Sequence, residues 1–152
     1  MTALKAELAQ LGKPLPDFLL PGAKPAAAPA AQPGQVQPAS YITGLLLGSW
    51  LYNQYVACGR TQWYEARVTS HWNLTDVLAR PRLGDPDLYV FSPLRGAWGN
   101  GEDSLLLVGY SVNPRGYADQ VGSFIADDFG DPGRFIIAVY GYTSASYNLL
   151  IW

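Results

Sequence analysis

Apolar and polar residues alternate along most of the chain after about residue 60, with the period of two that places successive side chains on opposite faces of a β-strand. Segments rich in Gly, Pro, Asn and Asp separate the alternating runs, at the spacing typical of a β-sandwich. The pattern predicts strands at 62–70, 72–79, 88–92, 104–110, 121–126, 134–140 and 146–152. The uncharged run 41–58 is expected to add one or two buried strands. We therefore predict an all-β fold, a two-sheet antiparallel β-sandwich of about eight strands with a jelly-roll-like arrangement.

The N-terminal residues follow a different pattern. Leu4, Leu8 and Leu11 recur at helical spacing, and Gly12 ends the predicted helix. A second apolar patch follows the prolines at 14 and 16. A helix of about ten residues is only marginally stable alone, so we expect it to dock on its own domain or on a neighbour. The candidate partner-binding residues of this arm are Leu4, Leu8, Leu11, Phe18, Leu19 and Leu20.

Pro and Ala dominate the segment that follows, a composition typical of an extended linker. The predicted domains are therefore a docking arm at 1–20, a linker at 21–40 and a β-sandwich at 41–152. A membrane helix needs about 20 apolar residues, and Asn53-Gln54 interrupts the apolar run 41–58 after roughly a dozen. We therefore predict no membrane span. The N-terminus also lacks the pattern of a classical secretory signal.

Charge and composition narrow the range of partners. The net charge is −2 without a basic cluster, so the electrostatic attraction that dominates nucleic-acid binding is missing and nucleic acid is not expected as a partner. Charged residues make up only 14% of the chain while aromatic residues reach 13%, which suits contacts with other macromolecules. Cys58 stands alone and is expected to be a small buried residue, the alternative being an intermolecular disulfide.

Any histidine-dependent catalytic motif would have to use the single histidine of the chain. His71 lies on a predicted strand, and the sequence contains neither a Gly-x-Ser-x-Gly elbow nor a histidine-based zinc motif. We therefore predict that the protein is not an enzyme. A hydrolase using His71 is the alternative, which the absence of these motifs from the sequence disfavours.

Acidic turns are candidates for a metal site. Asp85 and Asp87 precede one predicted strand, and calcium takes six to eight oxygen ligands from carboxylates and carbonyls. Aspartate next to Gly or Pro is also ordinary turn chemistry. The sequence thus allows a calcium site that includes Asp85 or Asp87, or turn structure alone, and no cofactor is required.

Aromatic residues are too numerous for all of them to lie inside so small a sandwich. Tyr140 and Tyr142 share one face of a predicted strand, and Trp98 lies in a glycine-rich loop. These three are our candidates for exposed contacts with sugar, with a fibrous protein or with another subunit.

A series of short motifs occurs in one order along the chain: Gly48-Ser49, Trp63-Tyr64, Asn73-Leu74-Thr75, Asp85-Pro86-Asp87-Leu88-Tyr89, Val139-Tyr140-Gly141 and Tyr147-Asn148-Leu149. In this order they resemble the bacterial pre-peptidase C-terminal domain, over roughly residues 44–152. The resemblance implies a small β-sandwich usually appended to exported proteins, of which some members bind calcium.

Two functions follow as hypotheses. The preferred one is a non-catalytic structural subunit of a surface, filament or virion assembly, in which the sandwich and the arm make protein–protein contacts in a homo-oligomer or larger assembly. The alternative is an extracellular module that binds carbohydrate or fibrous protein, as the resemblance implies, stabilised by calcium in some members. Either function places the protein outside the cell, at its surface or in a virion.

Overall fold

The computed structural model describes residues 1–20, 41–46, 48–67, 74–93, 105–125 and 134–152. The chain begins with helix α1 and the short 3-10 helix η1, and the rest of the described part consists of strands joined by turns. In order, the elements are α1 (Thr2–Gln10), η1 (Asp17–Leu19), β1 (Tyr41–Leu46), β2 (Trp50–Val56), β3 (Thr61–Arg67), β4 (Leu74–Leu83), β5 (Pro86–Pro93), β6 (Leu105–Ser111), β7 (Asp119–Ile125), β8 (Arg134–Gly141) and β9 (Ala145–Ile151).

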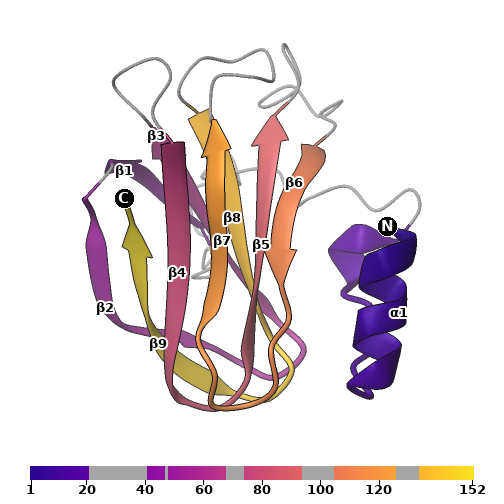
Figure 1. Ribbon diagram of the computed structural model, residues 1–152. Helices are drawn as coiled ribbons and strands as arrows, with labels where there is room; N and C mark the ends of the chain where they lie inside the picture. The colour runs from indigo at the N-terminus through magenta and orange to yellow at the C-terminus, as the bar shows by residue number, and fades with distance from the viewer. Residues whose placement is uncertain (21–40, 47, 68–73, 94–104, 126–133) are drawn as a thin grey trace, which may run out of the picture.

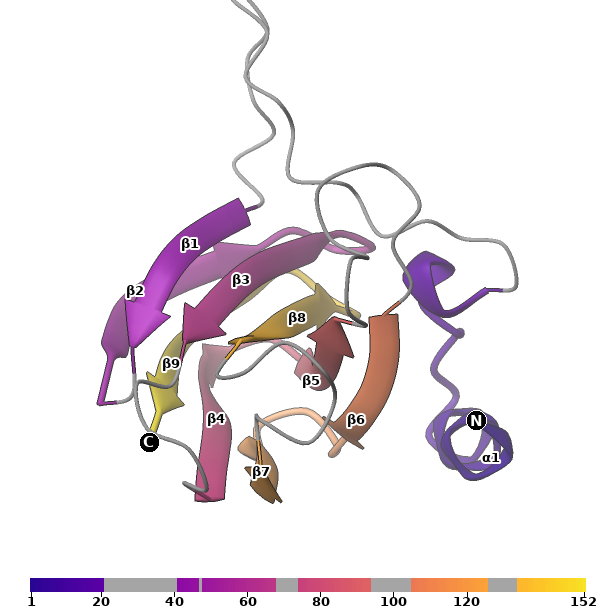
Figure 2. The same ribbon diagram turned by 90° about the horizontal axis from the view of Figure 1, so that it is seen from above.

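The strands form two sheets that face each other (Figures 1 and 2). The five-stranded sheet has the order β1-β3-β8-β5-β6 and the four-stranded sheet the order β2-β9-β4-β7. Every pairing is antiparallel except that of β1 with β3, which is parallel. The predicted all-β sandwich is confirmed, with one parallel edge pair that strand periodicity did not reveal.

The core between the sheets comes from alternate residues of facing strands. In β9 the odd positions from Ala145 to Ile151 are buried and the even ones are only half-buried. The hydroxyl groups of Tyr64 and Tyr147 lie 2.7 Å apart, and Tyr64 also donates to Oε1 of Gln54. Because Tyr64 belongs to one sheet and Tyr147 to the other, this pair joins the two layers through the middle of the core.

A second apolar layer lies on the outer face of the five-stranded sheet, where the arm covers it. Leu4, Leu8 and Leu19 are buried there, against side chains that include Trp63, Tyr89, Phe91 and Ile136. Figures 1 and 2 show α1 on one side of the sandwich, next to β6. The residues of β8 from Phe135 to Val139 are consequently buried on both faces, which explains why this strand reads as an unbroken apolar run.

Two expectations differ from the structure. Residues 41–58 were predicted as buried strands, yet β2 is an edge strand whose Trp50, Tyr52 and Tyr55 are 39%, 62% and 61% exposed. Among the described strands, β9 alone pairs with β2. Cys58, expected to be buried, is exposed at the end of this strand. In the described part of the chain, no helix has the length and apolarity that a bilayer crossing requires.

Candidate functional site: an aspartate cluster closed by the arm

The site is built around the turn between β4 and β5. Gly84 adopts a left-handed φ of +84°, and a Cβ at this position would lie 2.7 Å from Cα of Ala145. Only glycine therefore allows this turn to pack against the turn between β8 and β9. Hydrogen bonds tie the two turns together: the Asp85 amide donates to Oγ1 of Thr143, and the Tyr142 amide donates to the Asp85 carbonyl, each at 3.0 Å.

Lys13 of the arm inserts its ammonium group among the aspartates. Its Nζ lies 2.6 Å from Oδ1 of Asp87 and 3.1 Å from Oδ2 of Asp85, and it donates to the Asn113 carbonyl at 2.8 Å. It also lies 4.8 Å from the centre of the Tyr142 ring, within cation–π range. The lysine side chain is only 7% exposed. The three partners use all three ammonium hydrogens, which is what a buried lysine requires.

The end of α1 directs Lys13 to this position. Gly12 has a φ of +68°, and the Lys13 amide donates to the Leu8 carbonyl at 2.8 Å, as in a Schellman cap. The chain therefore leaves the helix directly after the residues that pack on the sheet. The apolar contacts of Leu4 and Leu8 and the ion pairs of Lys13 are parts of one docked segment.

Asp119, at the start of β7, completes the cluster. Its Oδ1 accepts hydrogen bonds from Oγ of Ser111 at 2.7 Å and from the Asn113 amide at 2.9 Å. Oδ2 of Asp119 and Oδ2 of Asp87 are buried and have no hydrogen-bond partner among the described residues. Two carboxyl oxygens thus stay unsatisfied in the interior, a costly arrangement for ionised groups.

Burial dominates the titration of these carboxyl groups. It raises the pKa of Asp87 to about 8, although the hydrogen bond and the charge of Lys13 act in the opposite direction. It raises the pKa of Asp119 to about 7, against the hydrogen bonds donated by Asn113 and Ser111. Repulsion by the charge of Asp85 also raises the pKa of both groups, and repulsion by Asp119 adds to that of Asp87. Asp87 and Asp119 therefore gain and lose protons near neutral pH.

The sequence had marked Asp85 and Asp87 as candidate calcium ligands. The structure brings them together and adds the carboxyl group of Asp119 and the carbonyl of Asn113 near the same lysine. Oxygen donors of this kind suit calcium. With the arm docked, however, the Lys13 ammonium takes the cation's place, and no group of three or more His, Cys, Asp or Glu in the described ranges is arranged to hold a metal ion.

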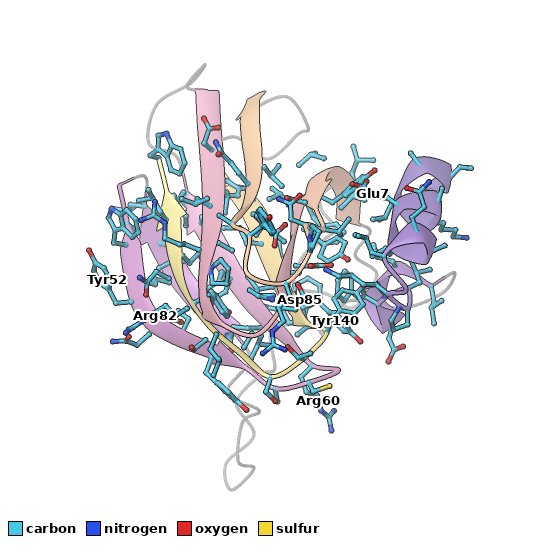
Figure 3. The ribbon with its side chains drawn as sticks, turned by 60° about the horizontal axis from the view of Figure 1, so that its bottom comes forward. Glu7, Tyr52, Arg60, Arg82, Asp85 and Tyr140 are labelled. Atoms are coloured by element: carbon cyan, nitrogen blue, oxygen red, sulfur yellow. The ribbon has the colours of Figure 1, made fainter. Side chains whose placement is uncertain are left out.

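The other predicted contact residues are divided between the interface and the surface. Phe18 packs edge-on against Trp63, Tyr89 and Tyr140, with ring centres 5.3, 5.2 and 6.1 Å apart. The Tyr142 hydroxyl donates to the Pro14 carbonyl at 2.6 Å. Tyr140 and Tyr142, expected to be exposed, are therefore half-buried beneath the arm of their own chain. Figure 3 shows Tyr140 and Asp85 on the side of the sandwich that faces α1.

Of the other predicted contact leucines of the arm, Leu11 is 37% and Leu20 46% exposed. Trp98, His71 and the linker 21–40 lie outside the described residues. Sequence reasoning missed Lys13 and Asp119. In the sequence, Asp119 is marked only by its position after a polar loop and before a predicted strand. Lys13 is marked only by its position after the glycine that ends the helix.

Two solved structures are similar to this chain. The pre-peptidase C-terminal domain of collagenase from Bacillus anthracis matches with a TM-score of 0.52 and 15% identity, over 78% of this chain and all of that domain. The periplasmic g-type lysozyme inhibitor PliG of Aeromonas hydrophila matches with a TM-score of 0.38 and 13% identity, over 74% of this chain and 96% of that one. No protein-family model and no curated protein sequence matches the chain.

The protein is thus a β-sandwich whose fold is like that of a pre-peptidase C-terminal domain. At 15% identity this likeness shows the fold alone.

Proposed function

We propose that the protein is a non-catalytic assembly module, in which the N-terminal arm links copies of the sandwich to one another. The observation that carries this proposal is the docked arm. A short segment buries Leu4, Leu8 and Leu19 on the outer sheet face and inserts Lys13 between Asp85 and Asp87. The interface is made by two parts of the chain that are far apart in sequence, so it does not depend on both belonging to one molecule.

Residues 21–40 set the reach of the arm. At ~3.1 Å per residue, an extended Pro-rich segment of this length spans about 60 Å, which is enough to reach a neighbouring sandwich. An arm docked on a neighbour would make the same contacts as an arm docked on its own sheet. The balance between the two depends on the protein concentration relative to the effective concentration of the tethered arm. The high protein concentration in a surface layer, filament or virion favours arm exchange, in which each arm docks on a neighbouring copy.

Light scattering on matched variants tests this proposal. A donor, Tyr142→Ala combined with Phe91→Ala, keeps its arm but has a weakened docking face, because Tyr142 contacts Pro14 and Lys13 of the arm. An acceptor lacking residues 1–38 has the face but no arm, and its folding is checked by circular dichroism. Mixing the two should give a 1:1 complex that neither forms alone. A donor that also carries Leu4→Ala and Phe18→Ala is the control and should form none.

The proposal fails if donor and acceptor stay monomeric together at millimolar concentration. It also fails if the control donor assembles as well as the intact one, because the arm contacts would then be irrelevant.

The second candidate is an extracellular module that binds carbohydrate or fibrous protein. The likeness of the fold to a collagenase pre-peptidase C-terminal domain supports it, and with it an exported location. Because Tyr140 and Tyr142 lie beneath the arm, pull-down on collagen fibrils and on insoluble polysaccharides uses the protein that lacks residues 1–38, which cannot exchange arms, with and without Tyr140→Ala and Tyr142→Ala.

Calcium stabilisation is a separate part of this second candidate. Asp85, Asp87, Asp119 and the Asn113 carbonyl would supply oxygen ligands once Lys13 leaves. Calcium should then raise the Tm of Lys13→Ala more than that of the wild type, because the ammonium no longer competes. Magnesium at the same concentration is the control, and equal Tm values with calcium and with chelator in both proteins would exclude the site.

A further inference from the structure

The outer face of the four-stranded sheet, on the other side of the sandwich from the arm, carries a row of exposed aromatic rings. Trp50 and Tyr52 stack with an angle of 8° between their planes and 5.7 Å between ring centres. Tyr55 follows on the same strand and is 61% exposed. Flat, nearly parallel rings at the surface offer hydrophobic contact area together with a polar edge.

A β-bulge shapes this row. The register of β2 against β9 shifts between Leu51 and Gln54, and Asn53 within the bulge has a φ of +54°. The Asn53 amide donates to Oδ1 of Asn148 at 3.0 Å, and Nη1 of Arg82 donates to Oδ1 of Asn53. The bulge is therefore held by side chains from β9 and from β4, and a local strand irregularity that re-aims side chains is a recurrent feature of binding sites.

Polar groups lie beside the rings. Asn148 pairs with Arg80 across β9 and β4, so both belong to the outer face. Arg80 and Arg82 are exposed, and within the described part of the chain neither has an ion-pair partner. Figure 3 shows Tyr52 and Arg82 near each other, on the side away from α1. Guanidinium and amide groups thus border the aromatic row.

The charge of this face is opposite to that of the whole molecule. The chain carries a net charge of −2, yet two arginines dominate here. Asp76, the acidic residue of β4 on this face, is four residues from Arg80, or about 13 Å along a strand, and accepts a hydrogen bond from Gln120. An anionic partner is therefore favoured at this place.

We infer that this face binds an acidic polysaccharide. The apolar face of a pyranose ring packs on an exposed aromatic ring, hydroxyl groups bond to the Asn148 amide, and a carboxylate or sulfate of the polymer pairs with Arg80 and Arg82. Arginine suits such anions because its planar donors match two oxygens at once. Nucleic acid also combines rings and negative charge. Two arginines on an acidic protein, however, fall short of the several phosphate contacts that give nucleic-acid binding its strength.

Affinity electrophoresis of the full-length protein tests the inference. Gels contain polygalacturonate, a uronic acid polymer, or heparin, a sulfated one, with neutral dextran as the matched control polymer. Polygalacturonate or heparin should slow the protein, dextran should not, and added salt should weaken the effect. Trp50→Ala and Arg80→Ala should each weaken binding at least tenfold while leaving the thermal transition in place.

Matched variants separate the site from general adhesion. Tyr117 and Arg115 are also an exposed aromatic residue and an exposed arginine, but they lie between β6 and β7. Tyr117→Ala and Arg115→Ala should bind as the wild type does. Lack of retardation by both acidic polymers overturns the inference. So does equal loss in the control variants, or binding of a single-stranded oligonucleotide as tight as that of the polysaccharides.

Discussion

The ammonium group of Lys13 lies 2.6 Å from Oδ1 of Asp87, a residue 74 positions further along the chain. The carboxyl group of Asp87 is fully buried and its second oxygen is without a hydrogen-bond partner among the described residues. The arm therefore does more than cover apolar surface, because it supplies the positive charge that the acidic turn lacks. Docking of the arm and titration of the aspartates are consequently linked.

Replacing Lys13 should loosen the arm. We expect Lys13→Met to lower the free energy of unfolding by about 1–3 kcal/mol, less than the full cost of breaking a buried pair because Asp87 can take up a proton. Hydrogen exchange of the α1 amides should become faster at the same time. Lys5→Met, on the exposed side of α1, is the control. Equal effects of the two substitutions would contradict the role assigned to Lys13.

Stability should depend on pH through the aspartate cluster. The pKa of Asp87 is raised to about 8 and that of Asp119 to about 7, whereas an aspartate in an unfolded chain titrates near 3.9. The folded protein therefore holds these protons more tightly. The stabilisation is complete below about pH 4 and is lost as the pH rises through 7 and 8.

Urea unfolding of the wild type and of Asp87→Asn between pH 5 and 8.5 isolates this effect, since asparagine mimics the protonated acid. Asp87→Asn should gain stability relative to the wild type as the pH rises, by at most about 1.4 kcal/mol per pH unit. Asp17→Asn, at an exposed position, should run parallel to the wild type. A difference between Asp87→Asn and wild type that stays constant over this range would refute the linkage.

Removing the Tyr64 hydroxyl should lower the stability of the fold more than removing the Tyr147 hydroxyl. In Tyr147→Phe the Tyr64 hydroxyl still donates to Gln54, whereas Tyr64→Phe leaves the Tyr147 hydroxyl without its partner. We expect a loss of about 1 kcal/mol for Tyr147→Phe and about 2 kcal/mol for Tyr64→Phe, the added cost being an unsatisfied buried group. Chemical denaturation measures both, and the double variant should cost less than the sum. A larger loss for Tyr147→Phe would reverse this account.

Gly84, in the turn that holds Asp85, can be compared with Gly116, a glycine in another turn. Both have left-handed backbones, with φ of +84° and +90°, but a Cβ at Gly116 meets no atom within 4 Å. We expect Gly116→Ala to cost about 1 kcal/mol, the backbone strain alone, and Gly84→Ala to cost several times more, because it also pushes the β8–β9 turn away. Thermal unfolding compares the two, and similar Tm values would show that the turns do not need to touch.

The alternation of apolar and polar residues and the composition of the turns were enough to predict the strands from β3 onward and the sandwich class. This works because the apolar residues of a strand show which of its faces is buried. Helical spacing likewise marked Leu4 and Leu8 of the arm, which the structure buries. Which strands pair with one another could not be predicted in the same way. The parallel pairing of β1 with β3 and the exposed position of β2 depend on which strand occupies the sheet edge, and that is not encoded in the period of a single strand.

By itself the sequence determined the sandwich, the apolar arm and the acidic turn at Asp85 and Asp87. Tertiary structure alone decided that Lys13 enters that turn, that Asp119 joins it, and that Tyr140 and Tyr142 lie beneath the arm rather than in open solvent. The physical reason is that hydrophobic periodicity is a local property of the chain. A buried charge, in contrast, is stabilised by partners that only folding brings within hydrogen-bonding distance.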